Sequence, residues 1–453
     1  MNHWAQDAVF YHMYPLGLCG APQVNDFHSA PVPRLEKIHG WLDHITGLGA
    51  TAVYLGPVFE SSSHGYDTAD YYRVDRRLGT NETLAALVRA MHDRGLRVVL
   101  DGVFNHVGRD FWAFRELREH GADARTCGWF AGLRFDRGNR SGDPFSYDTW
   151  AGHESLVKLN LANPDVRTHL LQAVEHWIDE FGIDGLRLDA ADVIDLEFLH
   201  SLANTCRSRK PDFWLMGEVV KGDYRRWANP ETLESVTNYE LYKGLYSSFN
   251  DRNFFEIAHT LNRQSGPYGL YNGLDFYNFT DNHDVSRVAS LLKQKAHLYP
   301  LYALLFTIPG IPSVYYGSEF GLPGISQNGS DVQLRPELDL AALAARPPEP
   351  GLLPALRSFA RLHRDLEPLR RGSYQQVLIA PEQFAFQREY EGRKILVLIN
   401  ASGQPARMDL VLSGWPDGRL DDRLNPGEGC TIIGSKASVV IPPCWARVLT
   451  APA

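Results

Sequence analysis

Short β-rich runs alternate with helical patterns over most of this chain of 453 residues, and this alternation restricts the fold more than any other feature. Such an order predicts parallel strands joined by helices. Strand candidates lie at residues 7–15, 50–57, 96–106, 185–189, 213–219, 235–240, 273–284 and 311–320. Eight strand and helix units in roughly 350 residues predict an α/β fold, the (β/α)8 TIM barrel, whose active site lies at the carboxyl ends of its strands.

The helix signals agree with this order of elements. The clearest helix is expected to begin at Pro164, since proline suits the first helical position, with Asn163 before it as the cap. Its apolar residues recur at helical spacing as far as Phe181. Two more helices are expected at 38–48 and 81–94, between the first three strands.

Two segments fall outside the barrel pattern. Residues 107–157 show no clear periodicity but are rich in Trp, Phe and Tyr, which indicates a folded excursion over the active-site mouth rather than a disordered loop. Beyond residue 370, alternating strands predict a C-terminal antiparallel β-sandwich domain. We therefore expect a barrel made of residues 1–106 and 158–370, an excursion domain B at 107–157 and a C-terminal β domain at 371–453.

Composition and charge exclude several classes of partner. The chain has 45 Lys and Arg against 54 Asp and Glu, a formal charge of −9, and no dense basic run, so we expect no nucleic-acid partner. No window approaches the roughly 18 apolar residues of a membrane span, so no membrane partner is expected. The N-terminus lacks the pattern of a secretory signal, which predicts a cytoplasmic location. Five scattered cysteines without a CxxC pair predict free thiols.

Four acidic residues stand at the ends of predicted strands: Asp101, Asp189, Glu218 and Asp284. A single acid in such a place is readily explained as a helix cap or a surface loop residue. Four of them would meet in one cavity of a barrel, where burial and mutual repulsion separate their pKa values. That separation allows one carboxyl group to donate a proton while its neighbour stays ionised, as acid/base chemistry requires.

Paired carboxyl groups that face one sugar carbon are the machinery of glycoside hydrolysis. A separation of about 5 to 5.5 Å between them favours a covalent, retaining route. Aromatic side chains make up 11% of the chain, which suits a site where sugar rings stack on flat side chains, although most of these rings are expected in the core. The pattern therefore indicates an enzyme that cleaves sugars.

Short motifs make this interpretation more specific. The segments DGVFNH (101–106), GLRLDAAD (185–192), MGEV (216–219) and FTDNHD (279–284) resemble, in order, the four short conserved regions of the α-amylase clan, glycoside hydrolase family 13. HGYDTADYY (64–72) and VYYGSEFG (314–321) resemble two further stretches of that clan. Each motif alone is weak, but the ordered set covers nearly the whole chain and identifies it as similar to this family.

The resemblance implies a role for each acid. Asp189 would be the nucleophile that forms a glucosyl ester, held ionised by Arg187, and Glu218 would be the general acid/base. Asp284 would be the third catalytic carboxylate, which binds sugar hydroxyls most tightly in the transition state. Asp101 would brace the site without reacting. The substrate-binding residues would be Tyr66, His106, Arg187, His283, Asp331 and Arg335. Either histidine, taken alone, could instead be a structural hydrogen-bond donor.

Within the clan, the chain most resembles the neopullulanase and cyclomaltodextrinase branch. LVKLN (156–160) is similar to a signature of that branch, and Asp331 with Arg335 resembles its pair that recognises a terminal glucose. A plain ion pair in a polar loop is the alternative for that pair. Many α-amylases carry an Asp at the position of Lys158 that helps to bind calcium, so we expect no cofactor and no metal there, although Asn105 remains.

The departures from the branch concern its specificity. That branch dimerises through an N-terminal β domain. We do not expect this domain here, because the first predicted strand begins near residue 7. An oligomer would therefore need another surface. Val219 and the AADV run at 190–193 differ from the branch, so the acceptor subsites should differ too. This domain organisation, without the N-terminal β domain, is similar to that of enzymes that hydrolyse cyclic maltosyl-maltose.

The expected function is a retaining α-glucoside hydrolase for malto-oligosaccharides or cyclic maltodextrins such as cyclic maltosyl-maltose, cleaving α-1,4 bonds and with α-1,6 bonds also open to it. A transglycosylase that uses the same ester is the alternative enzyme. A catalytically dead barrel that only binds sugar is the third hypothesis, but such a protein should have lost a catalytic carboxylate or gained a membrane helix. The sequence shows neither change.

Overall fold

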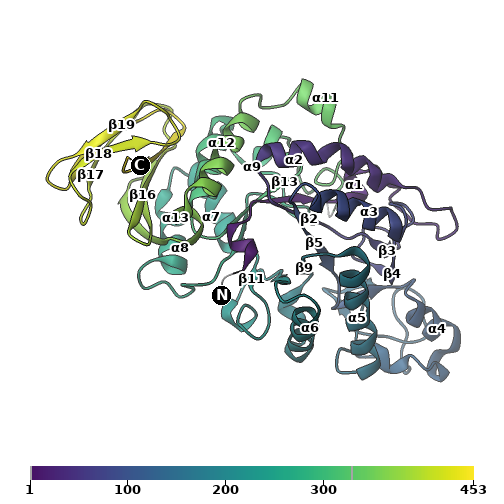
Figure 1. Ribbon diagram of the computed structural model, residues 1–453. Coiled ribbons are helices and arrows are strands. Elements are labelled where there is room, and N and C mark those ends of the chain that lie inside the picture. Colours follow the sequence, from purple (N-terminus) through teal and green to yellow (C-terminus); the bar gives the residue numbers. More distant parts are fainter. Residues whose placement is uncertain (1–2, 328–329, 453) are drawn as a thin grey trace.

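The computed structural model describes residues 3–327 and 330–452, and its centre is one eight-stranded parallel sheet (Figure 1). The strands follow the order β11-β10-β9-β5-β2-β1-β13-β12. Their bounds are β1 (Phe10–Met13), β2 (Ala52–Leu55), β5 (Arg97–Gly102), β9 (Gly185–Leu188), β10 (Trp214–Gly217), β11 (Ser235–Val236), β12 (Tyr277–Phe279) and β13 (Ile311–Tyr315). A parallel bridge between Thr237 and Tyr277 joins the two end strands. The predicted TIM barrel is therefore confirmed.

Each barrel strand lies within a predicted segment, and every segment was predicted longer than its strand. The strand expected at 235–240 ends at Val236, because Asn238 caps a helix there and its side chain accepts the N–H of Leu241 at 3.1 Å. The strand expected at 273–284 is only Tyr277–Phe279. The residues after it form a loop that carries part of the site described below.

Helices cover the outside of the barrel (Figure 1). The longer ones are α2 (Leu42–Leu48), α3 (Asn81–His92), α5 (Pro164–His176), α6 (Leu196–Arg209), α7 (Tyr239–Asn250), α8 (Phe254–Ser265), α10 (Leu298–Thr307) and α12 (Leu352–Asp365). Shorter ones are α1 (Pro15–Leu18), α9 (Val288–Leu291), α11 (Leu340–Ala345) and α13 (Glu367–Arg371). None of the helices in the described residues is sufficiently long and apolar to span a membrane.

The helix α5 has the start that its sequence predicts. The Asn163 side chain accepts the N–H of Asp165 at 2.9 Å, and Pro164 occupies the first helical position. The helical path continues through a π-helical turn, Trp177–Phe181, and ends at Gly182, whose φ of 71° is easily adopted by glycine. These local signals fix the helix that leads into β9.

The segment between β5 and α5 is folded and carries a small antiparallel sheet. Its strands are β6 (His106–Gly108), β7 (Thr149–Trp150) and β8 (His153–Lys158), in the order β6-β8-β7. The helix α4 (Trp112–His120), which the sequence analysis did not predict, packs Phe114 edge-on against Phe130, 5.2 Å between ring centroids. A hairpin of β3 (Phe59–Ser61) and β4 (Thr68–Val74) follows β2.

The chain ends in the predicted antiparallel β domain, beside α8, α12 and α13 (Figure 1). One sheet contains β14 (Ser373–Ile379), β15 (Gln383–Tyr390), β16 (Arg393–Asn400), β18 (Gly418–Asp422), β19 (Gly429–Ile432) and β21 (Trp445–Thr450). The other contains β17 (Ala406–Val411) and β20 (Lys436–Ile441). A separate apolar core that includes Leu396, Met408 and Ile441 draws on strands of both sheets. The domain thus has an interior of its own.

Candidate active site

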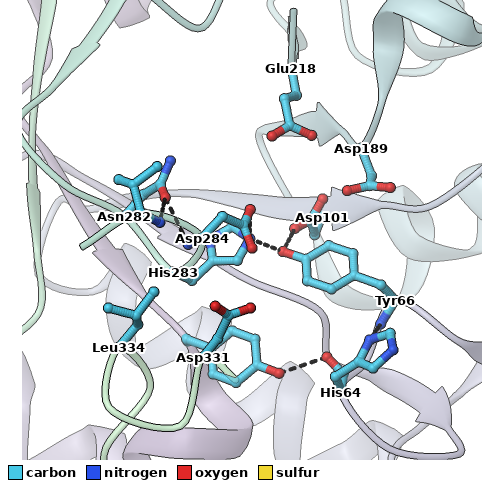
Figure 2. Close-up of polar contacts among 12 residues, drawn as sticks. His64, Tyr66, Asp101, Asp189, Glu218, Asn282, His283, Asp284, Asp331 and Leu334 are labelled. Atoms are coloured by element: carbon cyan, nitrogen blue, oxygen red, sulfur yellow. Dashed lines mark hydrogen bonds and ion pairs between the residues drawn. The ribbon is translucent and has the colours of Figure 1, made fainter. Parts of the chain in front are cut away.

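The site begins with the register of three adjacent barrel strands. The β5–β9 register pairs Asp101 with Arg187, and the β9–β10 register pairs Met216 with Arg187. Asp189 directly follows β9, and Glu218 directly follows β10. Because parallel strands end on one rim of the barrel, these side chains emerge side by side, as Figure 2 shows for the carboxyl groups.

Arg187 is the centre of this group. Its Nη1 lies 2.9 Å from Asp101 Oδ1 and 3.0 Å from Asp189 Oδ1, and its Nη2 lies 2.8 Å from Glu218 Oε2. The guanidinium is buried, with 3% of its side chain exposed. One buried cation therefore contacts three carboxyl groups, which confirms that the ends of these strands converge on a common site.

Asp284 approaches the same group from β12, but through a loop, five residues after the strand ends. Its Oδ2 lies 2.9 Å from Nε2 of His283. That histidine nitrogen also contacts the hydroxyl of Tyr66, which donates a 2.9 Å hydrogen bond to Oδ2 of Asp101. Figure 2 shows the part of this network around Asp284, His283, Tyr66 and Asp101. Through Arg187 it continues to Asp189 and Glu218, so that polar contacts link all four predicted carboxylates.

Asp331 and Arg335 form the predicted pair, with 3.1 Å between Oδ2 and Nη2. The same Nη2 lies 2.8 Å from Oδ1 of Asp284, and Nε of Arg335 donates to the carbonyl of His283 at 2.9 Å. The guanidinium also lies over the ring of Tyr14, 4.8 Å from its centroid. Arg335 therefore orients the third carboxylate as well as pairing with Asp331, which a plain surface ion pair would not do.

The environment shifts the pKa values of Asp189 and Asp284 in opposite directions. Burial raises the pKa of Asp189 well above its usual range, and the nearby Arg187 opposes this effect. Burial would also raise the pKa of Asp284, but His283 and Arg335 bring that pKa far below its usual range. Asp284 is therefore held ionised, whereas the charge of Asp189 depends on Arg187.

His106 is the first residue of β6 and is buried. Its Nε2 is 3.9 Å from Oδ2 of Asp189 and has no hydrogen-bond partner in the described part of the chain. Burial lowers the pKa of His106 to about 4, so the imidazole is neutral near pH 7. A neutral ring with a free nitrogen suits a hydrogen bond with a sugar hydroxyl.

Three residues of the site were not predicted. Tyr54, in β2, donates to Oδ2 of Asp101 at 2.7 Å. Tyr239 donates to Oε1 of Glu218 at 3.0 Å, and Asn282 donates to the Tyr239 hydroxyl at 3.3 Å. The only sequence signal for Tyr54 was that it carries a hydroxyl group in an otherwise apolar strand. Tyr239 was missed because the strand predicted at 235–240 included it, whereas β11 ends at Val236.

The sequence analysis predicts that no calcium is bound near Asn105 and Lys158. Oδ1 of Asn105 is buried and has no hydrogen-bond partner among the described residues. Lys158 stands opposite His106, the residue after Asn105, in the β6–β8 register. Across residues 3–327 and 330–452, no three His, Cys, Asp or Glu side chains are grouped closely enough to hold a metal ion.

Comparison with known proteins places this geometry in a family. The sequence profile of the alpha amylase catalytic domain matches residues 32–341. This chain belongs to the α-amylase family. It is accordingly a glycoside hydrolase by family, and the resemblance to the cyclomaltodextrinase branch is confirmed by its relatives.

Its α-amylase relatives are similar over most of their length. A cyclomaltodextrinase of a Bacillus species is 31% identical over 418 residues, which cover 88% of this chain and 73% of the relative. Neopullulanase 2 of Thermoactinomyces vulgaris is 29% identical over 425 residues, with coverages of 88% and 70%. The structure of cyclic alpha-maltosyl-(1→6)-maltose hydrolase from Arthrobacter globiformis, bound to cyclic alpha-maltosyl-(1→6)-maltose, matches with a TM-score of 0.83 at 29% identity and covers 99% of each chain.

Proposed function

We propose that this protein is a retaining α-glucoside hydrolase that acts on malto-oligosaccharides or cyclic maltodextrins such as cyclic maltosyl-maltose. The observation that carries the proposal is the contact of one guanidinium, Arg187, with both Asp189 and Glu218. Two carboxyl groups on one guanidinium are near enough to act on the same sugar carbon, as a double displacement requires. The substrates named for the similar proteins support the choice of an α-glucan.

In the first step, Asp189 attacks the anomeric carbon of the bound glucose. The glycosidic bond breaks as the new ester bond forms, and Glu218 gives its proton to the leaving oxygen. Asp284 would bind hydroxyls of the same sugar more tightly as positive charge develops at the ring. His106 and Tyr66 would help to fix the sugar at the cleaved position.

In the second step, a water molecule replaces the leaving group. Glu218, now ionised, takes a proton from this water while the water oxygen bonds to the anomeric carbon. The ester bond to Asp189 breaks, and its electron pair returns to that carboxylate. Two inversions at one carbon retain the α configuration, which distinguishes this route from a direct attack by water.

Substrate preference is tested by assaying the parent enzyme with a panel of sugars: maltotriose, cyclodextrins, pullulan, isomaltose, sucrose and cyclic maltosyl-maltose. We expect hydrolysis of maltotriose and of at least one cyclic sugar, with α products at early times in proton NMR spectra. Asp189→Asn serves as the blank. Release of β products, or a parent that cleaves no α-glucan, would contradict the proposal, and products longer than maltotriose would indicate the transglycosylase alternative.

We also propose that the site between barrel and excursion needs no calcium, since Lys158 places a positive charge beside it. Excess EDTA should therefore change neither kcat for maltotriose nor Tm. As a matched variant, Lys158→Asp supplies an acidic ligand near the unpartnered Oδ1 of Asn105, and calcium should then raise its Tm. A parent Tm that falls in EDTA and recovers with added calcium would contradict this proposal.

A further inference from the structure

Both carboxyl oxygens of Glu218 are occupied by hydrogen-bond donors. Oε2 lies 2.8 Å from Nη2 of Arg187 and accepts the backbone N–H of Ala190 at 3.2 Å. Oε1 accepts the hydroxyl hydrogen of Tyr239 at 3.0 Å. The proposed steps assign a role to Arg187 but none to this phenol, although it is the side chain that fixes the second oxygen of Glu218.

The ring of Tyr239 has little freedom to turn away. Tyr239 is the first residue of α7, directly after its cap Asn238, which donates from Nδ2 to the side-chain oxygen of Asn278 at 2.9 Å. The Tyr239 ring packs edge-on against Phe279 at the end of β12, with 5.0 Å between centroids. The start of the helix and the barrel strand therefore hold the phenol in place beside Glu218.

Asn282 determines which way the phenol hydrogen points. Its Nδ2 donates to the Tyr239 oxygen at 3.3 Å, so that oxygen acts as an acceptor there and its own hydrogen is left for Glu218. The Oδ1 of Asn282 accepts the backbone N–H groups of Asp284 at 2.8 Å and of Val285 at 3.1 Å. A hydrogen-bonded chain thus connects the loop of one catalytic carboxylate to the side chain of another.

We propose that Tyr239 is a positioning residue that fixes Glu218 and supports its ionised form during the hydrolysis of the glucosyl ester, an inference that rests on the proposed function. In that step Glu218 takes a proton from water, the water oxygen bonds to the anomeric carbon, and the bond to Asp189 breaks with its electron pair. A donor aimed at Oε1 stabilises the carboxylate that must accept this proton.

Tyr239→Phe tests the inference, with Tyr242→Phe as the matched control. Tyr242 lies one turn further along α7 and stacks on Phe279, and its hydroxyl has no hydrogen bond in the part of the chain that the structure describes. Loss of a hydrogen bond to a charged group should lower kcat for maltotriose about 10- to 100-fold, and KM should fall with it because the glucosyl ester accumulates. Tyr242→Phe should keep the parent values.

Two further measurements separate positioning from a merely structural role. In Tyr239→Phe, the fall of kcat/KM at alkaline pH should begin at a higher pH. The ionised form of Glu218 has lost a hydrogen-bond donor, so the protonated form that catalyses ester formation persists to higher pH. With 4-nitrophenyl α-maltoside, whose leaving group needs little protonation, ester formation should continue while ester hydrolysis slows. Stopped-flow traces should therefore show a larger burst of nitrophenol than the parent gives.

The outcomes distinguish the inference from the function on which it rests. A Tyr239→Phe enzyme with the kcat, burst and pH profile of Tyr242→Phe would overturn the inference and leave the hydrolase intact. A lower Tm with an unmoved alkaline limb would overturn it too, since it would show that the phenol acts only in folding. If the parent hydrolysed no α-glucan, or Asp189→Asn matched the parent, the proposed function itself would fail and the inference with it.

Discussion

Asp189→Asn should lower kcat for maltotriose by about 10⁴-fold or more while the protein still binds the sugar. An amide has no negative charge to attack the anomeric carbon and cannot form the ester. Its oxygen can still accept a hydrogen bond from Arg187, which lies 3.0 Å from the present carboxylate. Because burial already raises the pKa of Asp189, an uncharged side chain is tolerated there, and Tm should not fall. Initial rates, calorimetric binding of maltotriose and thermal melting measure these three expectations.

Asp184→Asn is the matched control for this variant. Asp184 is buried directly before β9, at the opposite end of the strand from Asp189, and accepts from Arg97 and from Lys210 at 2.8 and 2.7 Å. Its replacement should lower Tm, since Arg97 and Lys210 lose their buried anionic partner, but should leave kcat close to that of the parent below the melting temperature. If Asp189→Asn retained a tenth of the parent kcat, or lost activity only together with Tm, the nucleophile would be another residue.

Much of the barrel could be predicted because its signals are local. Asn163, Pro164 and Gly182 mark the two ends of one helix by cap chemistry that needs no tertiary structure. The end of β11 could not be predicted so well, because SVTNYE reads equally well as a continuous strand. What ends the strand there is the capping bond of Asn238 and its contact with Asn278, forty residues away in sequence.

The small elements outside the barrel were less predictable. The helix α4 has nine residues and buries only Ala113, Phe114 and Leu117, too few for a distinct helical period within a segment of scattered aromatics. In the C-terminal domain, β17 does alternate between buried and exposed side chains, but the run is only six residues long. Short elements of this kind owe their stability to the neighbours on which they pack, which the sequence does not show.

The carboxyl groups of the site were predictable, whereas the groups that orient them were not. Asp189 and Glu218 follow strands directly, so their position on the barrel rim follows from the fold alone. The contacts of Tyr54 with Asp101, and of Arg335 with Asp284, join residues 47 and 51 positions apart, across strands and loops. Only the relative placement of distant elements creates these bonds, and neither motif nor spacing reports it.

Arg187→Gln should be the second most damaging change, in activity and in stability together. Among the described residues, Arg187 is the only basic side chain within 4 Å of Asp101 or Glu218. Without Arg187, the only basic side chain that the described residues place within 4 Å of Asp189 is His106. Loss of a buried cation from a cluster of carboxyl groups costs about 3 to 5 kcal/mol in the free energy of unfolding. Loss of fixed charge at the reacting centre should lower kcat on the order of 10²- to 10³-fold.

The pH dependence of this variant tests the cause. Burial raises the pKa of Asp189, and Arg187 is the charge that counteracts it, so removing the cation raises that pKa further. Catalysis needs the ionised carboxylate, which is lost as the pH falls through this pKa. The acid limb of kcat/KM should therefore move to higher pH, and the difference in unfolding free energy between parent and variant should shrink in acid, where the carboxyl groups become neutral.

Arg97→Gln supplies the comparison, since Arg97 pairs with Asp184 and Asp212 at the opposite end of the barrel and 40% of its side chain is exposed. It should lose a little stability and keep the parent pH profile, as measured by urea unfolding and by kcat/KM from pH 4 to 9. An acid limb that stayed in place in Arg187→Gln would mean that Asp189 owes its charge to another group. His106 would then be the remaining basic side chain near it, 3.9 Å away, although its own lowered pKa leaves it neutral over most of that range.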